Sequence, residues 1–195
     1  MSDPLALIVG LGNPGAQYQH TRHNAGTDFV LRVAQLYGGT FKAEPKFKAQ
    51  IAKIAIAGRE LRLLIPETFM NLSGQSVGPA AQFFKLEPSA ILIAHDELDL
   101  PPGEARFKHD GGHGGHNGLR DIIPSLGNRR DFYRLRIGIG HPGAAPMVSG
   151  FVLSRAPLSE RQKIDACIEE AVANLPDAVS GDWPRAMKGL NSFRA

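Results

Sequence analysis

The sequence predicts an α/β fold, a single globular domain over residues 1–195 with a twisted, mixed and largely parallel sheet flanked by helices on both faces. Three observations predict this class. Two continuous apolar runs, Leu5–Leu11 and Ala90–His95, are typical of buried parallel strands. Strand-like segments alternate with segments of helical periodicity. No linker, repeat or low-complexity segment divides the 195 residues, which are enough for one domain with a substantial core.

In the first half of the chain, each expected element follows from a local pattern. Leu5–Leu11 is apolar almost throughout, which predicts a buried strand. Ala25–Tyr37 repeats apolar residues at helical spacing, and Gly38-Gly39 ends that helix. Gln50–Ile56 alternates, and a turn at Ala57-Gly58 joins it to Glu60–Pro66, which predicts a hairpin.

The second half continues the alternation. A helix is expected over Asn71–Phe84, opened near Ser73, and Pro79 can kink it. Ser159 and Gln162 predict a capping box for a helix that runs through Leu175. The other expected elements are, in order, a strand at Ala90–His95, a glycine-rich loop at Gly111–Gly118, a helix at Leu119–Leu126, a strand at Tyr133–Gly138 and a short helix at Pro184–Asn191.

Composition narrows the class of protein. Hydrophobic residues make up 43% and charged residues 21% of the chain, as in ordinary water-soluble domains. Lysine and arginine total 22 against 19 acidic residues, and the net charge of +3 permits a nucleic-acid partner without requiring one. The single cysteine, Cys167, excludes a disulfide framework and a cysteine-based zinc site. Without a signal peptide or an apolar run of about 18 residues, the sequence predicts no membrane association and a cytoplasmic location.

The glycine turn after the first strand is the strongest local signal. Gly10–Gly15 matches the pattern G-x-G-x-x-G of dinucleotide-binding folds. Two features disfavour that interpretation. Helical periodicity begins only near Ala25, and the acidic residue expected about 20 residues further on is missing. The turn instead holds an amide, Asn13, and leads to His23, which predicts a polar site at the carboxyl end of a strand.

His23 and Asp96 follow two different buried strands. Strand ends of an open sheet face the same crevice, so the two side chains can meet there. A carboxylate bonded to one imidazole nitrogen fixes the tautomer and leaves the other nitrogen free to take a proton. Because no serine or cysteine nucleophile is well placed, this pair would activate water. On the residues alone, the alternative that His23 caps a helix and Asp96 ends its strand in a turn stays open.

Three amides, Asn13, Asn71 and Asn117, lie in strand-to-helix loops. Each of the last two could be a simple helix N-cap. Three together favour a site, because amides offer donors and acceptors without charge and suit a carbonyl, a peptide or a ribose hydroxyl.

The glycine-rich loop raises the question of a metal. It gathers three histidines and an aspartate: His109, Asp110, His113 and His116. Clustered imidazoles can bind zinc, but the glycines between them give neither helical spacing nor preorganised geometry. We therefore expect no metal and no other cofactor.

Basic residues occur in local clusters, of which most are expected to form a solvated surface. Arg134 and Arg136 share one face of the expected strand, because strand side chains alternate. Lys108 and Arg136 are the better candidates for phosphate contacts, since both lie near ends of elements that lead to the crevice.

Taken together, the motifs resemble those of the bacterial peptidyl-tRNA hydrolase family. They are GLGNPG with a following Tyr and TRHNAG, P-x-T-F-M-N-x-S-G, HDELDLPPG, GGHGGHNGLRDI and RLRIGIGHP, in that order between Val9 and Pro142. Five motifs in order are far more specific than one. The resemblance implies a single α/β domain, in agreement with the pattern of elements.

The resemblance also implies a role for each matching position. His23 would be the catalytic base, Asp96 would hold it in its basic form, and Asn13 would help to distinguish N-blocked from free aminoacyl-tRNA. Lys108 and Arg136 would hold the 5′-phosphate region of tRNA. The positions implied to bind the peptidyl end are Tyr18, Phe69, Met70, Asn71, His116 and Asn117. One departure is visible, because His109-Asp110 replaces smaller or neutral residues before the glycine loop.

The expected activity is hydrolysis of the ester between a peptide and the 3′ ribose of tRNA, by a monomer without a cofactor. Peptidyl-tRNA would be the partner, and no membrane is involved. A non-catalytic module that binds RNA or peptide in the same crevice is the competing class of protein.

Overall fold

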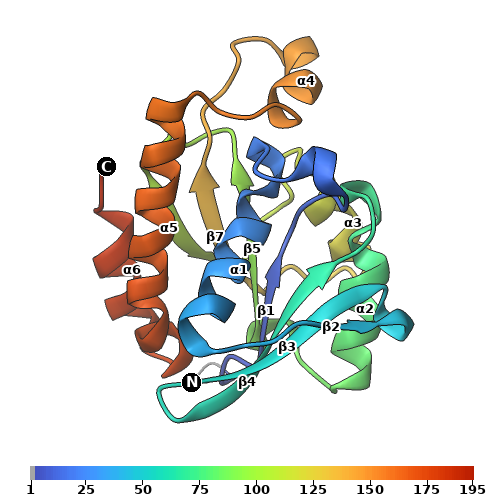
Figure 1. Cartoon of the computed structure of the whole chain (residues 1–195). Coiled ribbons are helices and arrows are strands. Elements are labelled where there is room, and N and C mark those ends of the chain that lie inside the picture. Colours follow the sequence, from blue (N-terminus) through green and yellow to red (C-terminus); the bar gives the residue numbers. More distant parts are fainter. Residues whose placement is uncertain (1–2) are drawn as a thin grey trace.

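Seven strands form one mixed sheet in the computed structural model, which describes residues 3–195 (Figure 1). Their spatial order is β2-β3-β4-β1-β5-β7-β6. The four central strands run parallel, and the strands at both edges pair antiparallel with their neighbours. The strands are β1 (Leu7–Gly10), β2 (Lys42–Glu44), β3 (Ala49–Ile56), β4 (Arg59–Pro66), β5 (Ile91–Glu97), β6 (Ala105–His109) and β7 (Tyr133–Gly138).

Helices cover both faces of this sheet, as expected (Figure 1). On one face lie α1 (Ala25–Tyr37), α5 (Leu158–Val179) and α6 (Trp183–Asn191), and on the other lie α2 (Gly74–Phe83) and α3 (Asn117–Ser125). Because strand side chains alternate, Ile8 of β1 packs under α1 while Leu7 and Val9 pack toward α2 and α3. The central strands are therefore apolar on both sides, which is why they read as continuous hydrophobic runs.

Several expected elements are confirmed, some with shifted ends. α1 and β7 have the expected bounds, and β1, β3, β4 and β5 differ from expectation by one or two residues at their ends. The helix expected over residues 71–84 is divided: a 3₁₀ turn occupies Met70–Leu72, and α2 begins at Gly74. Three short elements were not expected, namely β2, β6 and α4 (Val148–Val152). Each has five residues or fewer and lies at the rim of the fold, and so short a segment shows no readable periodicity.

The expected capping box of α5 is wrong. Pro157 occupies the N-cap position, no side chain caps the helix, and Ser159 already lies inside it. The helix also continues beyond Leu175, through Pro176, to Val179, because its apolar stripe remains buried to the end. At 22 residues it is the longest helix, yet no helix within residues 3–195 is long and apolar enough to cross a membrane.

Candidate active site

A cavity of about 600 Å³ opens at the carboxyl ends of the central parallel strands. The lining residues come from the loop after β1, the turn before α2, the end of β5, the glycine-rich loop with the start of α3, the paired strands β6 and β7, and α4. The polar side chains that line it are Asn13, His23, Asn71, His95, Asp96, Glu97, Asp99, Lys108, His113, His116, Asn117, Arg134, Arg136 and Ser149. Segments from most of the chain thus contribute to one crevice.

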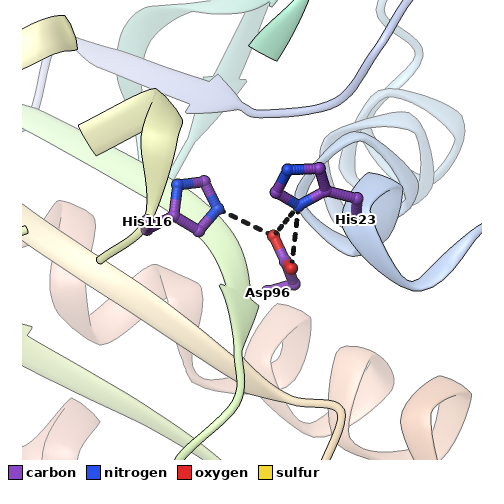
Figure 2. A group of neighbouring side chains, drawn as sticks. All are labelled: His23, Asp96 and His116. Atoms are coloured by element: carbon purple, nitrogen blue, oxygen red, sulfur yellow. Dashed lines mark hydrogen bonds and ion pairs between the residues drawn. The ribbon is translucent and has the colours of Figure 1, made fainter. Parts of the chain in front are cut away.

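His23 and Asp96 meet in this cavity, as the strand-end argument predicted. The Nδ1 atom of His23 lies 2.9 Å from each carboxylate oxygen of Asp96, and both residues are buried (Figure 2). Because the carboxylate can only accept, Nδ1 carries the hydrogen. The Nε2 atom is therefore the nitrogen that can take a proton. The alternative that His23 merely caps a helix is wrong, since it makes no cap to α1.

His116 is a second imidazole on the same carboxylate. Its Nε2 atom lies 2.8 Å from Oδ1 of Asp96, and its Nδ1 atom accepts hydrogen bonds from the main-chain N–H groups of Gly118 and Leu119. An Nδ1 atom that accepts must be unprotonated, so Nε2 carries the hydrogen and donates it to Asp96. His116 is thus the N-cap of α3 and an anchor for Asp96. Both ring nitrogens are engaged within the protein.

The protonation of these groups follows from burial and charge. Burial disfavours the imidazolium of His23, but the charge and hydrogen bond of Asp96 outweigh it and place the pKa of His23 above its usual value. Burial likewise disfavours the carboxylate of Asp96, yet the two imidazoles hold its pKa well below the usual range. Burial and the neighbouring His116 lower the pKa of His95 to about 4. Near pH 7, Asp96 is therefore charged and His95 is neutral.

A main-chain contact sets the distance between the two elements that carry His23 and Asp96. Gly26, in the first turn of α1, packs directly on β5: a Cβ atom there would lie 2.2 Å from the carbonyl oxygen of Ala94. Leu11 donates its N–H to the same carbonyl at 3.1 Å. Only glycine permits this close approach, which brings the start of α1 onto the end of β5.

Asn13 presents donors to the cavity. Its side-chain oxygen accepts a 2.7 Å hydrogen bond from the N–H of Met70, and Asn24 holds its main chain through two bonds of 2.8 and 3.0 Å. With the oxygen occupied, the Nδ2 group is the part of Asn13 that remains to bind a substrate.

The other two amides are not N-caps, contrary to the simpler interpretation. Asn71 lies inside the 3₁₀ turn before α2, and Asn117 is the first residue of α3, whose cap is His116. The Asn117 oxygen accepts a 2.9 Å bond from Arg120. Both residues line the cavity.

Phe69 and Met70 also line the cavity, whereas Tyr18 does not and contacts Phe69 instead. The rings of Tyr18 and Phe69 meet edge to face, with centroids 6.3 Å apart. Phe69 is 55% exposed, which is unusual for so large an apolar side chain and suits a contact with substrate.

Cations line the opposite part of the cavity, at the pairing of β6 with β7. Lys108 stands opposite Arg134 and Arg106 opposite Arg136, so all four side chains project from the same face. Lys108, Arg134 and Arg136 reach the cavity. Arg136 is held by a 2.8 Å bond from its Nε atom to Glu97.

Arg134 differs from its neighbours, because it is 3% exposed. The expectation of a solvated surface is wrong here. Its guanidinium donates to the main-chain carbonyls of Gly111 and Gly112 and lies 4.4 Å from the centroid of the Phe132 ring. It fixes the glycine-rich loop, which explains why a charged side chain is buried at this point.

The unusual pair His109-Asp110 lies beside the cations without joining them. Strand alternation places His109 on the face opposite Lys108, where its ring lies 4.4 Å from that of Tyr133. The Asp110 carboxylate accepts a 2.6 Å bond from the N–H of Gly111.

The histidines and the aspartate of the glycine loop do not form a metal-ligand set. Within residues 3–195, the group of three potential metal ligands with donor atoms within 4.8 Å is His23, Asp96 and His116. His23 and His116 each bond to Asp96, and the expectation of no metal stays a prediction.

Two contributions to the site were not expected from the sequence. His95 lines the cavity, and its Nδ1 atom donates to the main-chain carbonyl of Asp96 at 2.8 Å. A histidine inside an apolar strand, directly before the key aspartate, was the available signal. The wall formed by α4 had no signal, because five residues carry no readable period.

Comparison with known proteins gives a consistent set of relatives. A family model described as peptidyl-tRNA hydrolase matches residues 7–195. A peptidyl-tRNA hydrolase of Azotobacter vinelandii is 59% identical over 189 residues, which covers 97% of each chain, and one of Pseudomonas fluorescens is 57% identical over 191 residues, or 98% of each. The crystal structure of peptidyl-tRNA hydrolase from Acinetobacter baumannii has a TM-score of 0.95 to this structure at 52% identity, covering 97% of this chain and 96% of that one.

Proposed function

Because the chain belongs to the peptidyl-tRNA hydrolase family, we propose that it hydrolyses the ester between a peptide and the 3′ ribose of tRNA. The observation that carries this proposal is the buried His23–Asp96 pair. Asp96 holds the imidazole in the tautomer that leaves Nε2 unprotonated, as a general base requires. The products are a free peptide and a free tRNA. One domain, residues 1–195, carries the whole reaction.

In the proposed reaction, Nε2 of His23 removes a proton from water, and the water oxygen bonds to the ester carbonyl carbon. Asp96 stabilises the imidazolium that forms, through its charge and its bonds to Nδ1. The tetrahedral intermediate collapses when the bond to the 3′ oxygen breaks. The imidazolium returns its proton to that oxygen, which regenerates neutral His23.

Amide donors would stabilise the negative charge that develops on the carbonyl oxygen. Asn13 suits this role because its own oxygen is occupied by Met70, so that it offers Nδ2 only. Asn71 and Asn117 are further amides on the cavity wall. Uncharged groups of this kind favour a peptide amide next to the ester over a free α-ammonium, which accounts for a preference for N-blocked substrates. Phe69, Met70 and the neighbouring Tyr18 would contact the peptidyl end. His116 lines the same cavity, and we propose that it serves the substrate site mainly by orienting Asp96.

The cations on β6 and β7 would bind the tRNA backbone. Lys108 and Arg136 share a cavity with His23 and project from one face, which suits a phosphate contact while the ester lies at the imidazole. Since peptidyl-tRNA arises where translation takes place, we propose that the protein acts in the cytoplasm. We also propose that it acts as a monomer, which light scattering would test.

The deciding experiment measures release of tRNA from an N-blocked peptidyl-tRNA in the presence of a chelator. Turnover under these conditions supports an enzyme that activates water without a metal. Binding without turnover would instead support a module that recognises RNA or peptide. Activity that disappears with the chelator and returns with added zinc would point to a metal at His23, Asp96 and His116, the group whose donor atoms lie close enough to share an ion.

A further inference from the structure

The short helix α4 forms one wall of the cavity. Val148, Ser149, Val152 and Leu153 line it, and Figure 1 shows α4 at the top of the view, near the loop that leads to α1. A helix of five residues has no stability of its own, because its few hydrogen bonds cannot offset the cost of nucleation. Something outside the helix must hold this wall in place.

Arg22, directly before His23, makes those contacts. Its Nη1 atom donates to the carbonyl of Phe151 at 3.2 Å and to the hydroxyl of Ser154 at 2.5 Å, and its guanidinium lies 3.9 Å from the centroid of the Phe151 ring. The N–H of Arg22 donates to the carbonyl of Ser154 at 3.0 Å. Next to it, Thr21 forms a β-bridge with Arg155.

The burial of Arg22 shows that these contacts are more than a surface ion pair. The residue is 8% exposed, whereas its one acidic partner, Glu160, is half-exposed and 3.8 Å away. A guanidinium removed from water needs its hydrogen bonds within the protein. Here Phe151 and Ser154 supply two of them, so that displacement of the α4 segment would break both bonds and the contact with the Phe151 ring.

We propose that Arg22 is a positioning residue that fastens α4 across the cavity beside His23, and that this fastening strengthens the binding of peptidyl-tRNA. The inference rests on the proposed function for its effect on catalysis. A loose wall must be ordered each time that a substrate binds. That cost applies equally to the bound substrate and to the transition state, so it raises KM and leaves kcat nearly unchanged.

The test combines steady-state kinetics with amide hydrogen exchange on three single variants and on the Arg22→Ala/Ser154→Ala double variant. We expect Arg22→Ala to raise KM for an N-blocked peptidyl-tRNA about tenfold, as for a wall seated one-tenth of the time, with kcat within about threefold of the parent. Exchange should accelerate in residues 148–154 and stay unchanged in β5. Arg22→Lys keeps the positive charge but loses the planar guanidinium with its paired donors. Its KM and its exchange rate should lie between those of the parent and those of Arg22→Ala. Ser154→Ala should act in the same direction, and its effect should not add to that of Arg22→Ala, because both remove the same bond.

Arg32→Ala is the matched control, since it removes an arginine ion pair on the exposed side of α1 and should change neither readout. If Arg22→Ala does not fold, Arg22→Lys and Ser154→Ala decide the matter. Unchanged exchange in residues 148–154 would overturn the proposal. So would a fall in kcat with a shifted pH profile, because Arg22 would then act on His23. If the parent protein shows no turnover, the proposed function fails, and the exchange measurements alone still decide whether Arg22 fastens α4.

Discussion

The cavity has two parts, one around Asp96 and one around Lys108, and their side chains are held in different ways. Around Asp96, a buried imidazole and a largely buried one are hydrogen-bonded to the carboxylate, with donor–acceptor distances of 2.8 to 2.9 Å. Around Lys108 the side chains are longer and, apart from the buried Arg134, more exposed to solvent. Bond cleavage needs catalytic groups fixed to within a fraction of an ångström. Cations, by contrast, attract a phosphate backbone over a distance of several ångströms. The difference predicts steep losses from substitutions in the first half and graded, salt-dependent losses in the second.

The largest effect should come from His23→Ala, which removes the base. We expect kcat to fall by about 10²- to 10⁴-fold, the usual scale for the loss of a general base, with the fold intact. Single-turnover kinetics with N-blocked peptidyl-tRNA and a thermal melt check this. His20→Ala, at an exposed histidine three residues earlier, is the control and should keep its activity. A folded His23→Ala variant with nearly full activity would show that His23 is not the base, and that the part of the cavity around Asp96 is not where the chemistry takes place.

Asp96→Asn should be the next most damaging change, with a loss of roughly 10²-fold. An amide can donate to Nδ1 as well as accept from it, so it no longer holds one tautomer. The sign of the pH effect also follows. Asp96 raises the pKa of His23, so the neutral variant should have a lower His23 pKa, and the acidic limb of the kcat/KM profile should move to lower pH. An unchanged profile and rate would separate Asp96 from the chemistry.

Much of this catalytic half could be predicted from the sequence. The meeting of His23 with Asp96 follows from two strand ends in one open sheet. The contact of His116 with Asp96 does not follow, because it depends on where the glycine loop turns, and glycines leave that path open. The burial of Arg134 was not predicted for a related reason. Its partners are main-chain carbonyls of the same loop, and no pattern of side chains in the sequence indicates such contacts.

The rim of the fold was less predictable than the sheet. The edge strand β6 and the helix α4 are short, and each is stabilised by neighbours that come from distant parts of the chain. The capping box at Ser159 shows the reverse error, in which a valid local signal lost to a helix that begins earlier. β6 and α4 escape prediction because each is too short to bury a face of its own.

Asn13 lies between the two extremes and permits a sharper test. Asn13→Ala should lower kcat/KM about tenfold and weaken the preference for N-blocked over free aminoacyl-tRNA, as expected for one lost donor to a developing charge. Asn13→Asp keeps an oxygen for the N–H of Met70 but removes the donor. If both variants lose activity, the donor matters. If Asn13→Asp behaves as the parent protein does, Asn13 acts only by holding Met70.

The smallest effects should come from Lys108→Ala and Arg136→Ala. We expect KM for full-length peptidyl-tRNA to rise about three- to tenfold at low salt and its salt dependence to flatten by about one counterion. A peptide ester of a short 3′ fragment should be cleaved almost as before. Lys53→Ala, which removes the same charge from the distant hairpin, controls for net charge. Equal losses on the long and the short substrate would erase the distinction between the two halves.

The contact of Gly26 with the carbonyl of Ala94 has a consequence for how this protein can change over generations. A spacing set by main chain against main chain has no rotamers to sample, so conservative exchanges among the apolar side chains under α1 leave this contact itself unchanged. One methyl group at position 26 would do the opposite, pushing the helix away from β5 while the rest of the core could still pack. Mutational drift among those side chains is thereby uncoupled from drift in the contact between α1 and β5.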